Sequence, residues 1–129
     1  MSIKYQQGDV LLVAVSNEEV RNNQASFNTR THDGEEKKVI LAEGEATGHH
    51  HRFEIQKLAR GTSIVSYHDR SPHVRQRVSR FPHYILIKGG SATLYHEEHK
   101  PLTLPPGLYR RSIVREFDHL GRISREVVD

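Results

Sequence analysis

The chain has 129 residues, a formal net charge of +3 and a calculated pI of about 9.3, with a mean hydropathy of −0.68. This length suits one domain with a real hydrophobic core and is too short for two. The sequence contains no cysteine, which excludes disulfides and thiolate metal ligands. It has neither an apolar run of membrane-spanning length nor a signal-peptide core after Met1, so we expect a cytoplasmic protein. The positive charge suits a small-molecule or anionic ligand.

The apolar pattern in the first half of the chain predicts short strands. Residues 9–15 form a β-branched run bounded by Gly8 and by Ser16-Asn17. Residues 17–36 are polar and predict a long loop with one helical turn from Glu18 to Arg21. A strand is expected to resume at 38–42. Residues 52–58 alternate apolar with polar side chains, as a strand with one solvent-exposed face does.

The second half continues the pattern. Strands are predicted at 62–67, 84–88, 92–96, 102–104, 108–117 and 122–128. Gly89-Gly90 separates two of these runs and indicates a hairpin between 84–88 and 92–96. No long segment has a helical period, so residues 1–129 are predicted to form one small all-β domain, a β-barrel or a β-sandwich. The residues expected to contribute to its core are Val10, Leu12, Ile40, Phe53, Ile55, Ile64, Ile85, Ile87, Leu104 and Ile113.

Ten histidines are the strongest chemical signal in the sequence, and five of them fall in two groups. His49, His50 and His51 follow Gly48, and His96 and His99 bracket Glu97-Glu98. Neutral imidazole is the commonest protein ligand of transition metals. If the fold brings the two groups together, they can supply a complete set of ligands for a divalent transition metal, and the residue types do not discriminate among zinc, iron, nickel, copper and manganese.

Strand geometry narrows the ligand set. On extended backbone, His49 and His51 point to the same side and His50 points away. Glu54 is three residues after His51 and so points to the opposite side of an extended strand. It joins the site only if the strand contains a bulge or bend. One residue of the pair His96 and His99 is expected there, with His96 favoured. The predicted metal ligands are therefore His49, His51, His96 or His99, and Glu54.

The histidine loop resembles the first motif of the cupin barrel, which is a glycine, five residues, His-x-His, three or four residues, glutamate, six residues and a glycine. Here Gly44, His49, His51, Glu54 and Gly61 match it, with the first and second gaps each one residue shorter. The resemblance covers residues 44–115 and implies a cupin-like barrel with a metal site. The second cupin motif is matched by Pro105-Pro106-Gly107.

This chain departs from the second motif at two places. Arg110 stands where a ligand histidine is expected, and His99 stands where the opening glycine is expected. His96 or His99 would then replace the missing ligand. The segments 43–49 and 96–99 also resemble a family of small uncharacterised bacterial proteins, a resemblance that implies no activity.

A metal site with an open position could support catalysis. Glu97 or Glu98 would serve as a general base, and Tyr95 or Tyr109 as a proton donor. The sequence leaves open whether the protein is an enzyme. The alternative interpretation of the two glutamates is that they are solvated residues of a turn.

Two other functions compete with metal binding. Arg70, Arg75, Arg77 and Arg80 lie among histidines and aromatic residues, a pattern typical of RNA or single-stranded nucleic-acid binding. The second group of arginines, after residue 109, alternates with acidic residues and indicates a solvated face. The remaining alternative is a structural or assembly protein that pairs through edge strands, and a homo-oligomer is compatible with each of these functions.

Overall fold

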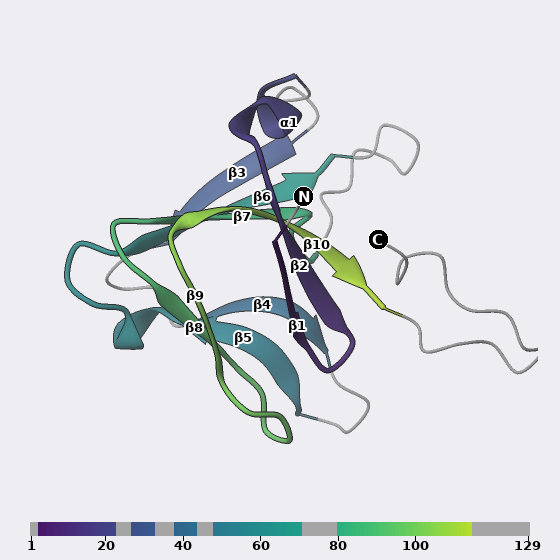
Figure 1. Ribbon diagram of the computed structural model, residues 1–129, viewed down its shortest axis with the longest axis vertical. Helices are drawn as coiled ribbons and strands as arrows, with labels where there is room; N and C mark the ends of the chain where they lie inside the picture. Colours follow the sequence, from purple (N-terminus) through teal and green to yellow (C-terminus); the bar gives the residue numbers. More distant parts are fainter. Residues whose placement is uncertain (1–2, 23–26, 33–37, 44–47, 71–79, 115–129) are drawn as a thin grey trace, which may run out of the picture.

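The computed structural model describes residues 3–22, 27–32, 38–43, 48–70 and 80–114, which form two antiparallel sheets (Figure 1). The larger sheet has the order β1-β2-β10-β7-β6-β3 and the smaller one β4-β5-β8-β9. The strands of the larger sheet are β1 (Lys4–Gln7), β2 (Val10–Val15), β10 (Gly107–Ile113), β7 (Tyr84–Lys88), β6 (Ser63–Asp69) and β3 (Phe27–His32). Those of the smaller sheet are β4 (Lys38–Glu43), β5 (His50–Glu54), β8 (Ala92–Tyr95) and β9 (Leu102–Leu104). The helical elements are α1 (Asn17–Arg21) and the 3-10 turn η2 (Ile55–Lys57).

The predicted all-β fold is confirmed, and the two sheets do not close into a barrel. Alternating strand residues from both sheets pack into one shared core, as period-two patterning requires. The fully buried members include Phe53 of β5, Ile64 of β6, Ile85 of β7 and Leu94 of β8. Eight of the ten residues expected in the core are buried, and Ile113 packs against it partly exposed.

Ile40 is the exception, because it alternates with Val39 and Leu41, the residues of β4 that face the core. A β-bulge follows it. Ile40 pairs with Arg52, but the next paired residue is Ala42, opposite His51. The extra residue reverses the facing of the strand beyond it. As a result Ala42 is buried next to the buried Leu41, whereas Ile40, before the bulge, is half-buried.

Two sequence-based element predictions were wrong. The helical turn expected from Glu18 to Arg21 is present as α1, but the expected loop at 17–36 also contains the strand β3. The polar residues of β3 suit an edge strand that pairs on one side, with β6. The expected hairpin between 84–88 and 92–96 does not form, because β7 pairs with β6 and β10 whereas β8 pairs with β5 and β9. The chain crosses between the sheets there. The predicted strand at 122–128 lies outside the described residues.

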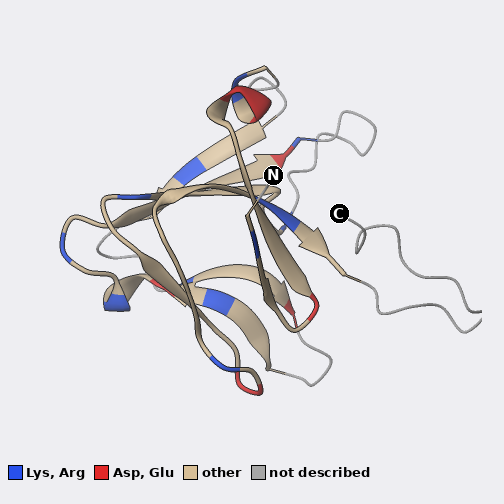
Figure 2. Ribbon diagram, viewed as in Figure 1, with Lys and Arg blue, Asp and Glu red and all other residues tan. Residues whose placement is uncertain are grey.

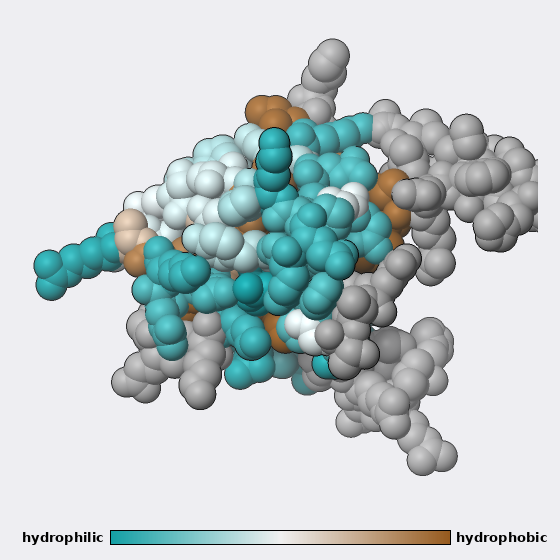
Figure 3. All heavy atoms as spheres, turned by 90° about the horizontal axis from the view of Figure 1, so that it is seen from below, coloured by the Kyte–Doolittle hydropathy of each residue, from teal (hydrophilic) through white to brown (hydrophobic). Residues whose placement is uncertain are grey.

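The two sheets approach each other along one side, where β1 packs against β9. The face seen in Figure 3 is mainly hydrophilic, as the low mean hydropathy predicts. Within the described ranges, no helix has the length and apolarity needed to cross a membrane.

Candidate metal centre

Three histidines from separate parts of the chain meet where β1 and β2 approach the smaller sheet. His51, His96 and His99 each offer a ring nitrogen, and these nitrogens lie within 4.8 Å of one another. The centroid of the His51 ring is 4.2 Å from that of His96 and 5.7 Å from that of His99. His51 lies on β5, and the other two lie in the bend between β8 and β9. Three converging imidazoles are a donor set that nitrogen-rich metal sites use.

Gln7 at the end of β1 fixes which nitrogen of His51 carries the proton. Its Nε2 donates to the carbonyl oxygens of Leu94 and Lys100, each at 2.9 Å. The amide oxygen Oε1 is therefore left as the acceptor, 2.9 Å from His51 Nδ1. His51 Nδ1 must donate this hydrogen bond, so Nε2 of the neutral ring presents its lone pair. This is the arrangement in which a ligand histidine is oriented by a neighbour that accepts from its other nitrogen.

The Nε2 lone pair of His51 faces a carboxylate. Asp9 Oδ1 lies 3.3 Å from His51 Nε2, although the His51 side chain is 2% exposed. Burial, together with the positive charge that His96 would carry, lowers the pKa of His51 to about 4, and the opposing effect of Asp9 is smaller. At neutral pH the Nε2 lone pair of His51 thus faces the Oδ1 atom of Asp9, and both atoms are acceptors. A cation bound between them would stabilise this arrangement.

Gly8 allows the histidines to approach the β1–β2 turn. It has a φ of +57°, which is costly for residues with a Cβ. A Cβ at this position would lie 2.6 Å from His99 Nε2 and 3.1 Å from His51 Cε1. Gln7, Gly8 and Asp9 therefore line one side of the cluster, and Figure 2 shows the acidic colour at this turn.

His96 has a buried nitrogen with no hydrogen-bond partner among the described residues. Its Nδ1 accepts from the backbone amide of Glu98 at 3.0 Å, and its Nε2 is the unpartnered atom. Leaving a buried polar group unpaired costs about 1–3 kcal/mol. Burial and the positive charge that His99 would carry lower the pKa of His96, and Glu97 opposes this, so the ring is held neutral.

Glu97 ties the bend that carries His96 and His99 to the strand that carries His51. Its carboxylate accepts from the His50 backbone amide at 3.0 Å and from Arg52 Nη1 at 3.0 Å. Burial would raise the pKa of Glu97, but these two donors outweigh it and the pKa is lowered. Glu97 is thus an ionised positioning residue, engaged with β5.

The other predicted ligands lie beside the cluster or away from it. His49 Nδ1 is 3.5 Å from Glu98 Oε2, and its ring centroid is 5.8 Å from that of His96. Glu54 accepts from Arg52 Nε at 2.8 Å and lies near Lys57. The structure therefore brings His51, His96 and His99 together, with His49 at the edge and Glu54 engaged elsewhere.

Both members of the His96 and His99 pair reach the cluster because residues 97–99 form a bend. In a regular strand, His96 and His99 would point to opposite sides, because they are three residues apart. That is why only one of them was expected at the site. Sequence reasoning missed Gln7 and Asp9. The available signal was Gln7-Gly8-Asp9 at a predicted strand boundary, but nothing local indicates that this turn faces residues more than forty positions away.

The remaining candidate residues have other contacts. The Tyr95 ring lies under Lys57, with Nζ 4.5 Å from its centroid. Tyr109 donates to the Pro105 carbonyl oxygen at 2.6 Å. Arg110, at the position of the expected cupin ligand, donates to Glu19 Oε2 at 2.8 Å and joins the sheet to α1.

The arginine group proposed for nucleic-acid binding is described in part. Arg70 is exposed, and Arg80 donates to Glu43 Oε2 at 2.7 Å. Arg75 and Arg77 lie outside the described residues. Nucleic-acid binding by this group stays a prediction.

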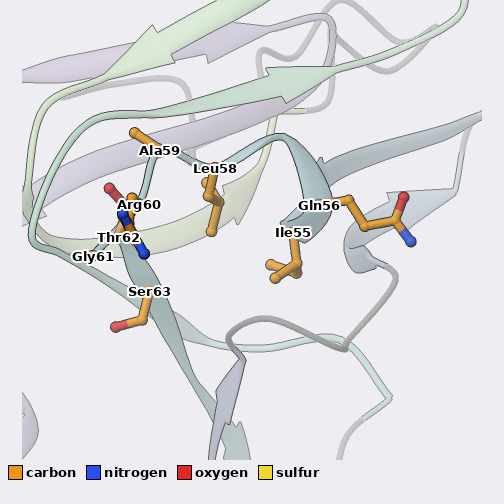
Figure 4. Close-up of a pocket in the computed structure, with 8 residues that line it drawn as sticks. All are labelled: Ile55, Gln56, Leu58, Ala59, Arg60, Gly61, Thr62 and Ser63. Carbon is orange, nitrogen blue, oxygen red and sulfur yellow. The ribbon is translucent and has the colours of Figure 1, made fainter.

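A hollow of about 470 Å³ lies between η2 and β6, away from the histidine cluster (Figure 4). Ile55, Leu58, Arg60 and Thr62 are among its lining residues. This lining holds no carboxylate or imidazole. It therefore lacks the ligand types that a metal centre needs.

Comparison with protein-family models gives one match over most of the chain. The chain belongs to the family described as a domain of unknown function (DUF8820), whose model matches residues 6–114. This match is not to a cupin family, and the cupin resemblance holds for the all-β character of the fold alone. Comparison with curated proteins and with solved structures gives no match.

Proposed function

We propose that this protein binds one divalent transition metal ion through His51, His96 and His99, with Asp9 as a fourth ligand. The observation that carries the proposal is the lone pair of His51 Nε2, which Gln7 directs at the Asp9 carboxylate and at two further imidazoles. A shell of three nitrogens and one oxygen suits zinc, iron, nickel, copper or manganese.

The donor atoms need small movements to reach bonding geometry. In a tetrahedral zinc site with Zn–N distances of about 2.0–2.1 Å, the ligand nitrogens lie about 3.4 Å apart. The three histidine nitrogens lie within 4.8 Å of one another, so side-chain rotation of the exposed His99 covers most of the difference.

Metal binding also requires a change at His96. Because the Glu98 amide donates to Nδ1, the proton of the neutral ring resides on the unpartnered Nε2. Coordination through Nε2 moves that proton to Nδ1, which can no longer accept from Glu98. The Glu98 amide is therefore expected to be among the backbone groups that change most when metal binds.

The chemistry depends on Asp9. If Asp9 binds with the three histidines, the protein fills four positions and the ion stabilises the junction of the two sheets. If water replaces Asp9, the ion can activate that water, and the carboxylate beside it can accept the proton.

Calorimetric titration of untagged, EDTA-treated protein with zinc tests the proposal. We expect one equivalent to bind, and His99→Gln to weaken the affinity at least about tenfold, since a ligand is lost. His83→Gln is the matched control, because His83 lies outside the cluster. No binding of zinc, nickel, cobalt or manganese, or equal weakening in both variants, would contradict a metal site at these histidines.

A further inference from the structure

A second polar site lies on the opposite side of the molecule, between the edge strands of the two sheets. β3 ends the larger sheet and β4 ends the smaller one, and a pocket of about 180 Å³ lies between them. Aliphatic residues of β4 form part of its wall. The polar and aromatic residues that line it are Arg30, His32, Lys38, His68, Arg80 and Phe81.

The charge of this lining is positive. Arg30, Lys38 and Arg80 contribute three cationic side chains, and no described acidic residue lines the pocket. One lining residue has a carboxylate partner: Arg80 Nη2 donates to Glu43 Oε2 at 2.7 Å. Both side chains of this pair are largely exposed, and such surface pairs are weak, so an anionic ligand can replace Glu43 at Arg80.

Two buried imidazoles, of His32 and His68, line the pocket, and the buried hydroxyl group of Ser66 bridges them without lining it. Ser66 Oγ lies 2.8 Å from His32 Nε2 and 3.0 Å from His68 Nε2, and all three residues are buried. These are polar side chains on the inner face of β3 and β6, where the neighbouring residue Ile64 is part of the core. The bridging hydroxyl holds both rings in place, which gives the pocket a fixed polar wall.

From this arrangement we infer that the pocket binds the phosphoryl group of a small molecule. Guanidinium groups carry the charge opposite to that of phosphate, and their N–H donors fit the geometry of its oxygen acceptors. The pocket is smaller than the roughly 300–1,000 Å³ that drug-sized ligands occupy, so it suits a compact anion with few atoms beyond the phosphoryl group. The inference is independent of the metal proposal, because no residue is shared between the two sites.

Titration of EDTA-treated protein with pyrophosphate and with inorganic phosphate tests this inference. EDTA removes any metal at the histidine cluster, which would otherwise bind phosphate itself. We expect saturable binding that Arg30→Gln and Lys38→Gln each weaken about tenfold, since each removes a charge-assisted contact. Glu43→Gln should tighten binding about threefold by releasing Arg80.

Arg60→Gln is the matched control, because it removes the same charge from an exposed residue of the other hollow. The inference is overturned if Arg60→Gln weakens binding as much as Arg30→Gln, or if neither anion binds. It is also overturned if a single-stranded oligonucleotide binds while pyrophosphate does not. That last result would favour an extended nucleic-acid surface.

Discussion

At the scale of single residues, three consecutive positions with different chemistry shape the candidate metal centre. Gln7 sets the tautomer of His51, Gly8 leaves space for His99, and Asp9 faces the His51 lone pair. None of them belongs to the histidine groups that dominate the sequence. The reactive side chains are thus positioned by a turn that is distant from them along the chain.

Gly8→Ala tests the space requirement. The new Cβ would lie 2.6 Å from His99 Nε2, so zinc affinity should fall about tenfold or more as His99 is displaced. Gly48→Ala is a close control, because Gly48 also has a positive φ, +86°, but its Cβ would meet nothing within 4 Å. Both variants should lose about 1–2 kcal/mol of stability from backbone strain. Equal zinc affinities in calorimetric titrations of the two variants would contradict the assigned role of Gly8.

At the scale of secondary-structure elements, patterning predicted most strands because alternation directly reflects one buried face. It failed where the backbone departs from regular geometry or where pairing is non-local. The bulge in β4 places Ala42 in the core beside Leu41, which alternation does not predict, and the bend at 97–99 brought both His96 and His99 to one side. Gly89-Gly90 indicates a turn but not the sheet in which the next strand pairs, so β7 and β8 were wrongly joined.

Gln7 also connects elements, because its amide donates to two carbonyl oxygens of the smaller sheet and the segment after it. Gln7→Leu leaves these acceptors and His51 Nδ1 without their partner, so we expect a loss of about 2–4 kcal/mol in the free energy of unfolding. Gln6→Leu, at the neighbouring exposed position, should change it by less than about 0.5 kcal/mol. Urea denaturation of both variants measures the difference. Similar stabilities would show that the amide does not join the two sheets.

At the scale of the whole molecule, the two-sheet arrangement creates two different sides. Along one side β1 packs on β9 near the histidine cluster, and along the other the edge strands β3 and β4 leave the cationic pocket between them. The sequence indicated the histidines of the first side and, of the cationic residues of the pocket, Arg80 alone, as part of a nucleic-acid-binding group. It could not indicate that the two sites lie on opposite sides, because strand order depends on pairings between distant segments.

The stability of the metal-free protein should fall in mild acid. The pKa of His51 is about 4 in the folded protein and about 6.5 when unfolded, so the unfolded chain binds a proton first as pH decreases. The contribution of His51 is complete above pH 6.5 and is lost between 6.5 and 4, by up to about 3 kcal/mol. His96, His99 and Asp9 face the His51 ring, and their charges act on its pKa. Urea unfolding in EDTA should show a weaker pH dependence for His51→Gln, and identical profiles would contradict this assignment.

The central claim is that His51 presents an Nε2 lone pair to a metal ion. Long-range proton–nitrogen NMR of the histidine rings at pH 7.5 measures this in metal-free protein and after addition of one equivalent of zinc. We predict that His51 is protonated at Nδ1 in both states, and that zinc shifts its Nε2 together with a ring nitrogen of His96 and of His99. A His51 ring protonated at Nε2 in the metal-free protein, or three rings that do not respond to zinc, would contradict the account.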